Sequence, residues 1–272
     1  MSVVFEDVHY IYPSKVHALN GVSVEFQPSE IVALMGENGS GKTTFLKHIN
    51  GLLKPTHGRV IVEGLVTSKA SVAELSQKAG LVFQNAEDMF FESTVFDEVA
   101  FALRNFGYSE EKIRKRVEWA LKFFELEPYA NQSPFLLSGG EKKRLAMAII
   151  LAWGPRIVCL DEPTIGQDSI QKEKMRHMVK LLNLQGRTVV LASHDVEFVA
   201  ELKPRIILLS KGRIIADGSS EEILTDLPTL EKASVLPPQL VAALKRVEDL
   251  GIDYRVLDVD EAVEKVVKAI NR

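Results

Sequence analysis

Apolar residues fall into short runs along most of the chain, with helical patterns between the runs. In some runs they occupy alternating positions, which is typical of strands with one buried face, whereas uninterrupted runs indicate fully buried strands. The predicted strands are 3–8, 22–26, 31–35, 59–64, 80–84, 157–160 and 187–193, followed by a hairpin over 205–217. A short helix is expected over 70–79. Strands that alternate with helices in this way predict an α/β fold.

The middle of the chain, about 85–153, has a different pattern. Apolar residues recur every three or four positions over 110–126, and Ser109 is placed to cap that helix. Helices are also expected over 95–106 and 142–153. We therefore predict a helical insert between two halves of the α/β core.

Beyond about Leu227 the chain changes character, because several prolines interrupt it. The pattern predicts a helix over 238–250, an extended piece over 254–259 and a last helix over 261–270. This segment, 226–272, is expected to form a small α+β appendage. It carries no chemical motif, and a stabilising or dimerising role is the preferred interpretation.

A glycine-rich stretch follows the apolar run 31–35 and precedes a helical pattern. Glycines let the backbone curl so that successive N–H groups face an anion, and the following helix adds its positive end. Lys42 could then reach the β- and γ-phosphates of a nucleotide, and the Thr43 hydroxyl could bind Mg²⁺. The full spacing favours this phosphate loop over a plain glycine-rich turn. Its residues are Gly36, Glu37, Asn38, Gly39, Ser40, Gly41, Lys42, Thr43 and Thr44.

Polar residues end three of the predicted buried strands. Asp161 and Glu162 follow 157–160, and ligands of open α/β sheets bind at the carboxyl ends of strands. Asp161 is placed to hold the Mg²⁺ shell, and Glu162 to accept a proton from an attacking water or to orient it. Gln84 and His194 end two other strands. In a phosphate-loop protein they become candidates for contact with Mg²⁺ or water and with the γ-phosphate, respectively.

Two further features have a functional and a purely structural interpretation. Ser138-Gly139-Gly140 precedes a helix and could bind a phosphate through its hydroxyl and N–H groups, but it is also a good generic helix start. Tyr12, before Pro13, could stack on a nucleobase, but a tyrosine before proline is often only a packed strand end. The residues alone leave both alternatives open.

Composition narrows the class of protein. The chain has 272 residues, of which 46% are hydrophobic, and this predicts an ordinary soluble globular protein. A formal net charge of −4 gives no electrostatic case for nucleic-acid binding. The single cysteine, Cys159, excludes an internal disulfide and is expected to be buried. No secretory signal is found, and the longest apolar run, near 146–153, is far short of the ~20 residues of a spanning helix.

The order and spacing of the motifs resemble the ATPase subunit of an ATP-binding cassette (ABC) transporter over about 2–225. The motifs beyond the phosphate loop are the glutamine loop at Gln84, the second carboxylate motif over 157–162 and the switch histidine His194. The D-loop aspartate matches Asp168, although the usual Gly-Leu-Asp reads Gly-Gln-Asp here. The family signature is Leu137, Ser138, Gly139, Gly140 and Glu141.

The resemblance implies features of the fold and the mechanism that the residues alone do not show. It implies a P-loop NTPase core with a mixed sheet, an N-terminal antiparallel β subdomain and the helical subdomain. It also implies ATP hydrolysis with Mg²⁺ in a head-to-tail dimer, where the signature of one copy covers ATP held by Lys42 of the other. Gln84, Thr43 and Asp161 would then hold the metal. Tyr12 matches the residue that stacks on adenine, with Ala18 beside it.

A narrower resemblance is to the energy-coupling factor (ECF) group, which drives uptake of vitamins or of cobalt and nickel. It rests on 82–88 and 94–101, with Ala86 and Met89 departing from the usual pattern. It implies a second copy or a paralogous ATPase as partner, and a peripheral place on the cytoplasmic face of the membrane. A membrane subunit would contact residues 84–91. Met89, Phe90 and Phe91 could form part of that contact surface or equally part of the core of the helical subdomain.

Two alternatives differ in class from a transporter subunit. A soluble ABC ATPase acting on nucleic acid or ribosomes would be expected to show a second cassette, a long coiled-coil insertion or a basic surface, and the sequence shows none of these. A regulatory cassette that binds ATP without hydrolysing it is disfavoured by the intact Lys42, Glu162 and His194.

Overall fold

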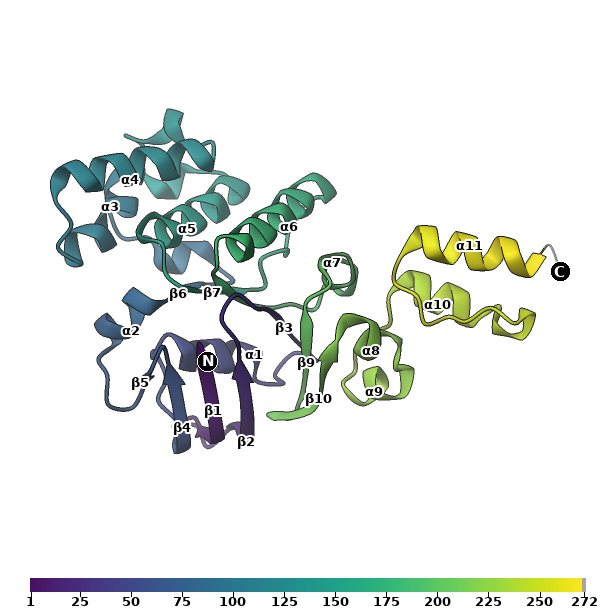
Figure 1. Cartoon of the computed structure of the whole chain (residues 1–272). Helices are drawn as coiled ribbons and strands as arrows, with labels where there is room; N and C mark the ends of the chain where they lie inside the picture. Colours follow the sequence, from purple (N-terminus) through teal and green to yellow (C-terminus); the bar gives the residue numbers. More distant parts are fainter. Residues whose placement is uncertain (271–272) are drawn as a thin grey trace.

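The computed structural model describes residues 1–270 and contains two sheets (Figure 1). The smaller sheet is antiparallel, with strand order β2-β1-β4-β5. Its strands are β1 (Val3–Ile11), β2 (His17–Phe26), β4 (His57–Val62) and β5 (Leu65–Val66). Tyr10 and Ile11 belong to β1, so the turn between β1 and β2 is shorter than the sequence predicted. The antiparallel pairing of this sheet confirms the expected N-terminal antiparallel β subdomain.

The larger sheet has six strands in the order β10-β9-β3-β8-β7-β6. All neighbours are parallel except β9 and β10, which form the predicted hairpin. The carboxyl ends of the parallel strands therefore lie along one edge, where the phosphate loop and the polar strand ends meet. The strands are β3 (Ile31–Met35), β6 (Ala79–Val82), β7 (Ile157–Asp161), β8 (Thr188–Ala192), β9 (Arg205–Ser210) and β10 (Arg213–Ser219).

Both faces of the parallel strands in this sheet are buried, as their apolar runs predicted, whereas β10 is partly exposed. In β3, Val32 and Leu34 point to the core shared with the smaller sheet, whereas Ala33 and Met35 point to the core under the helices. The same alternation places Cys159 of β7 in the first core, fully buried. Burial raises the pKa of its thiol, so Cys159 acts as a small apolar residue.

Helices cover the sheets and form the predicted insert, with α3, α4 and α5 packed on one another (Figure 1). Ser109 is the N-cap residue of α4 but makes no capping hydrogen bond. The α-helices are α1 (Lys42–Ile49), α2 (Val72–Lys78), α3 (Val95–Asn105), α4 (Glu110–Phe123), α5 (Gly139–Trp153), α6 (Ser169–Leu184), α7 (Val196–Leu202), α8 (Ser220–Thr225), α9 (Leu227–Lys232), α10 (Gln239–Lys245) and α11 (Val259–Ile270). Short 3₁₀ helices occupy Ala86–Met89, Glu127–Tyr129, Pro134–Leu136 and Glu248–Leu250.

The C-terminal segment differs from the prediction. No strand forms over 254–259, and Val259 instead begins α11, so the described part of the appendage (226–270) is helical rather than α+β. The rest of the predicted segment, 271–272, lies outside the described residues. Helices α10 and α11 stand apart from the main body in Figure 1 and share a small core around Leu244 and Ile252. A single extended piece between helices has no partner strand to pair with, which is why it stays irregular.

No helix in the part of the chain that the structure describes is long and apolar enough to cross a membrane.

A buried histidine in the helix after the phosphate loop makes the stability of the protein depend on pH. His48 of α1 is fully buried, and its Nδ1–H donates to the Thr44 carbonyl at 2.7 Å while Nε2 has no partner. Burial lowers its pKa to about 4, below the ordinary 6.5. Between these two values the unfolded chain binds the extra proton, so stability falls as the pH falls through this window.

We expect His48→Asn, which keeps a donor near the Nδ1 position, to reduce this acid sensitivity. From pH 7 to pH 5 the wild type should lose about 2 kcal/mol of unfolding free energy through His48 alone. The variant should not show this loss. Urea unfolding at the two pH values measures the difference. Equal losses in the two proteins would contradict the assignment.

Candidate nucleotide-binding site

The phosphate loop joins the end of β3 to the start of α1, and its glycines are required by close backbone contacts. Gly36 and Gly41 have φ of 140° and 109°, which L side chains rarely adopt. A Cβ on Gly36 would collide with the Leu209 carbonyl oxygen, and one on Gly41 would lie 2.6 Å from the Ala18 carbonyl oxygen. The loop is thus held between β9 and β2 at the start of α1.

Lys42 is folded back over the loop that precedes it. Its Nζ donates to the carbonyl oxygens of Gly36 at 2.8 Å and Glu37 at 3.0 Å. Burial lowers the pKa of Lys42, whereas the nearby carboxylates of Glu162 and Asp161 raise it. Because two backbone carbonyls are its hydrogen-bond partners, the ammonium can turn to a phosphate without breaking an ion pair.

A cavity of about 410 Å³ opens over the loop, within the size range of small-molecule sites. It brings together residues that the sequence predicted from distant positions. The same cavity is lined by Val16 and Ile165, which the sequence did not single out because single apolar residues carry no motif. The predicted residues that line it are Tyr12, Ala18, Asn38, Gly39, Gly41, Lys42, Thr43, Thr44, Gln84, Glu162 and His194.

Glu162 and His194 form a hydrogen-bonded pair at the edge of the sheet. Oε2 of Glu162 lies 2.8 Å from Nδ1 and 3.3 Å from the backbone N of His194. The Glu162 side chain is 8% exposed, whereas that of His194 is 57% exposed. Glu162 also has φ of 49°, a left-handed conformation that costs about 1–2 kcal/mol outside glycine. The carboxylate is thus fixed by its neighbour and by its backbone.

Asp161 lies deeper in the site. The residue is buried, and its Oδ1 has no hydrogen-bond partner in the described part of the chain. Burial raises the pKa of Asp161, whereas a hydrogen bond from Thr43 lowers it. Burying a carboxylate oxygen without a hydrogen-bond partner costs free energy, and a bound cation would remove that cost. Asp161 and the Thr43 hydroxyl therefore fit a Mg²⁺ ion, which prefers hard oxygen ligands.

Tyr12 lies at the rim of the cavity. Its hydroxyl is 3.0 Å from Oγ1 of Thr44, and its ring packs edge-on against Tyr10 with centroids 4.9 Å apart. Tyr12 is half-buried: it packs against Tyr10 and also lines the cavity. The packing and binding interpretations of Tyr12 are therefore compatible.

The signature residues do not line this cavity. Ser138 is the N-cap of α5, and its Oγ and N–H both bond Oε2 of Glu141 at 2.7 Å. Hydrogen bonds from Tyr129 and Ser138 lower the pKa of Glu141 to about 2. A Cβ on Gly139 or Gly140 would meet no atom within 4 Å. This helix start is exposed and open. Asp168 is likewise exposed, and it caps α6 by accepting from the Gln171 N–H.

Comparison with known proteins agrees with the fold and the motifs. The family model described as ABC transporter matches residues 19–165. The chain belongs to the ABC transporter family. Among solved structures it is similar to the ATP-binding cassette MJ0796 in a dimeric post-hydrolysis state bound to ADP and Pi. That likeness has a TM-score of 0.73 and 35% identity, and it covers 80% of this chain and 98% of the other.

Within the family, the near-full-length relatives include ECF proteins. The chain is 37% identical to the energy-coupling factor transporter ATP-binding protein EcfA2 of Clostridium perfringens, over 99% of both chains. It is 36% identical to EcfA of Methanocaldococcus jannaschii, over 92% of this chain and 91% of the relative. CbiO1 from Clostridium perfringens, described as part of the ABC transporter complex CbiONQ, has a TM-score of 0.74 at 30% identity. It covers 92% of this chain and 98% of the other.

We expect Glu162→Gln to retain ATP binding and to lose turnover. The amide keeps the size of the side chain and a contact with His194 but accepts no proton, and a positioned base contributes ~10²–10⁴-fold to the rate. Phosphate release gives kcat, and a fluorescent ATP analogue gives affinity. Glu118→Gln, on the exposed side of α4, is the matched control. Wild-type turnover in Glu162→Gln would exclude this carboxylate as the base.

Proposed function

We propose that this protein is the ATP-binding and ATP-hydrolysing subunit of an ECF-type uptake transporter and acts as a head-to-tail dimer. The observation that carries the proposal is that the signature residues do not line the cavity over the phosphate loop. The cavity over the phosphate loop contains Lys42, Glu162 and His194, whereas the second anion-binding helix start faces solvent. A second copy would bring that helix start, Ser138–Gly140, over the γ-phosphate.

The described residues divide the chemistry between them. Backbone N–H groups of the loop bind the phosphates, and Lys42 moves from its two carbonyls to the β- and γ-phosphates. Thr43, Asp161 and Gln84 would hold Mg²⁺, which supplies charge neutralisation when bound. Glu162 accepts a proton from the attacking water, and His194 holds that carboxylate in place. Tyr12 stacks on the adenine, with Ala18 beside it.

The partner in the membrane is proposed to contact the segment after Gln84. Phe90 is buried and Met89 half-buried, so these two belong to the helical core, whereas Phe91 is 59% exposed. Phe91 packs edge-on against Phe101 with centroids 4.5 Å apart. Exposed aromatic residues that lie together mark an interaction surface.

A buried carboxylate orients this aromatic pair. Glu98 of α3 is 1% exposed, and its Oε2 accepts from the N–H groups of Phe91 and Glu92 at 3.0 and 2.8 Å. The loop that presents Phe91 is therefore fixed, so that a movement of the helical layer would be passed to whatever contacts the ring. We place the protein on the cytoplasmic face of the membrane, with a vitamin or a transition-metal ion as the transported substrate.

The appendage is proposed to help hold the dimer together. Helix α11 exposes an apolar stripe at a spacing of three or four residues, which is the pattern of a helix face that packs on another surface. The stripe consists of Val259, Val263, Val267 and Ile270. A second copy of the chain supplies the same stripe, so a symmetric contact is possible.

We expect Ser138→Arg to leave ATP binding at Lys42 intact and to abolish the ATP-dependent dimer. The longer cation would occupy the space above the exposed helix start that the γ-phosphate of the other copy must enter. Size-exclusion chromatography with light scattering, with and without ATP, measures the effect. Gln77→Arg, at an exposed position on α2, is the control. A Ser138→Arg protein that still dimerises with ATP would refute the shared site.

We expect Phe91→Asp to preserve the ATPase activity of the isolated subunit and to weaken its recovery with the membrane subunit by about tenfold or more, as for a central aromatic anchor. Co-purification of the assembled transporter from detergent extract measures this. Phe123→Asp, at an exposed aromatic residue that ends α4, is the control. Undiminished recovery of Phe91→Asp would show that the membrane subunit contacts another surface.

A further inference from the structure

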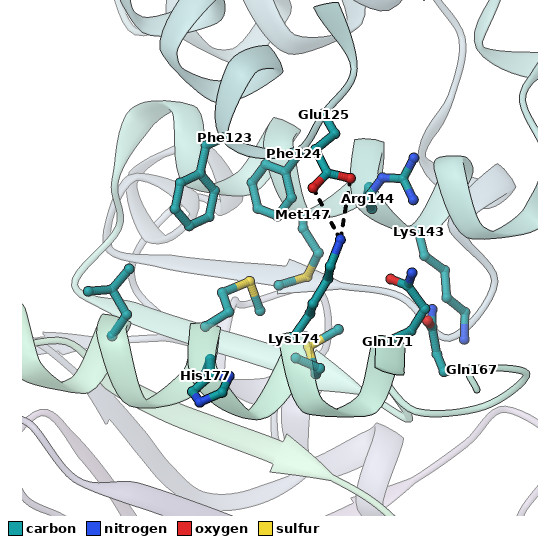
Figure 2. Close-up of a pocket in the computed structure, with 13 residues that line it drawn as sticks. Phe123, Phe124, Glu125, Lys143, Arg144, Met147, Gln167, Gln171, Lys174 and His177 are labelled. Atoms are coloured by element: carbon teal, nitrogen blue, oxygen red, sulfur yellow. Dashed lines mark hydrogen bonds and ion pairs between the residues drawn. The ribbon is translucent and has the colours of Figure 1, made fainter. Parts of the chain in front are cut away.

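A second cavity lies at the seam between the helical layer and the sheet core, away from the phosphate loop. We call it the seam pocket. It measures about 290 Å³, near the lower limit for small-molecule sites. Figure 2 shows the end of α4 and the side of α5 above it and α6 below. Helix α6 packs mainly on β8 and α7, and α4 and α5 pack on each other, so the seam is loosely filled.

The floor and walls of the seam pocket are apolar and adaptable. Three of the six methionines of the chain line it, and unbranched thioether side chains adjust to ligands of different shape. Met147 and Met178 are buried, whereas Phe123 and Leu181 are about 40% exposed and form the mouth. The apolar lining residues are Phe123, Phe124, Met147, Met175, Met178 and Leu181.

The polar side chains around the seam pocket are mostly basic. The basic residues are Lys143, Arg144, Lys174 and His177, beside the neutral Gln167 and Gln171 and a single carboxylate, Glu125. Lys174 reaches across the pocket to Glu125, with Nζ–O distances of 3.1 and 3.4 Å (Figure 2). Both partners are more than half exposed, so this ion pair contributes little and can rearrange.

His177 is paired with Glu173, with Nε2 3.3 Å from Oε1. In the part of the chain that the structure describes, Lys143 and Arg144 form no ion pair with a carboxylate. Lys143 donates to the Ile165 carbonyl, and burial lowers the pKa of Lys143. The Nε of Arg144 is buried and makes no hydrogen bond. A buried guanidinium N–H without an acceptor is costly, and an anionic ligand would satisfy it.

We propose that the seam pocket binds a small monocarboxylate with an apolar body. The carboxylate lies between Arg144 and Lys174, and the body lies among the three methionines. A cationic ligand is disfavoured because the basic side chains around the pocket outnumber its one carboxylate. A volume of about 290 Å³ limits the body to a short acyl chain or a single aromatic ring.

The location brings such a ligand close to the catalytic centre. Lys143, Met147 and Met175 also line a small cavity whose other walls include Gln84 and Glu162. Ile165, which accepts the hydrogen bond from Lys143, lines the nucleotide cavity. A ligand in the seam pocket is therefore separated from Glu162 by a single layer of side chains.

The test is a titration of the full chain with octanoate, followed by the methyl signals of ¹³C-labelled methionine, each assigned by a Met→Leu replacement. Met147, Met175 and Met178 should shift saturably, with a Kd on the order of 1 mM for so few ligand atoms. Met35, in the core behind the phosphate loop, should not shift. Octan-1-ol, which lacks the charge, should bind at least about fivefold more weakly.

Two variants separate specific from non-specific binding. Lys174→Met keeps an apolar stem without the charge and should weaken octanoate binding about fivefold or more, whereas Lys180→Met, on the same helix outside the pocket, should not. Leu181→Trp should block the mouth. Absence of saturable shifts up to the solubility limit of octanoate would overturn the proposal. So would equal binding of octanoate and octan-1-ol together with an unaltered Kd in Lys174→Met.

Discussion

The site depends on a close backbone contact at two glycines. Gly36 and Gly41 leave no room for a Cβ against β9 and β2, and this fixes the loop at the carboxyl edge of the sheet. Parallel pairing of β3, β8, β7 and β6 then brings the other strand ends to the same edge. Lys42, Glu162 and His194 meet there around one cavity. The catalytic arrangement is thus a consequence of strand order.

Charge is distributed unevenly around that edge. Asp161 is buried with an unpaired oxygen, and Glu162 is held in a left-handed conformation by His194 and by its backbone bond to Ala192. Each feature costs free energy in the isolated chain and is offset by the packed sheet beneath it. A bound nucleotide with its metal would remove the first cost. In the proposed dimer, a second copy of the chain would complete the site by adding the exposed helix start of α5.

Much of this arrangement could be predicted from the sequence, because phosphate chemistry demands particular residues at fixed spacing. The phosphate loop, Asp161 and Glu162 were found from their strand contexts, and the described cavity contains the predicted Tyr12, Ala18 and Gln84 as well. Val16 and Ile165 could not be found, since an apolar residue beside a cavity looks like any other. The extended piece predicted over 254–259 forms no strand, because strand pairing depends on a partner that a local pattern does not reveal. The seam pocket arises from residues on three helices and has no sequence signature.

The central claim is that two copies share each ATP site, and cysteine cross-linking tests it most directly. Asn38→Cys and Ser138→Cys place one thiol on the phosphate loop and one at the exposed helix start, and the native Cys159 is buried and unreactive. In the Glu162→Gln background, where bound ATP persists, mild oxidation should give a disulfide-linked dimer with ATP and Mg²⁺ and little without them. A doubly substituted protein that forms no linked dimer with ATP, or forms it equally without nucleotide, would contradict the claim.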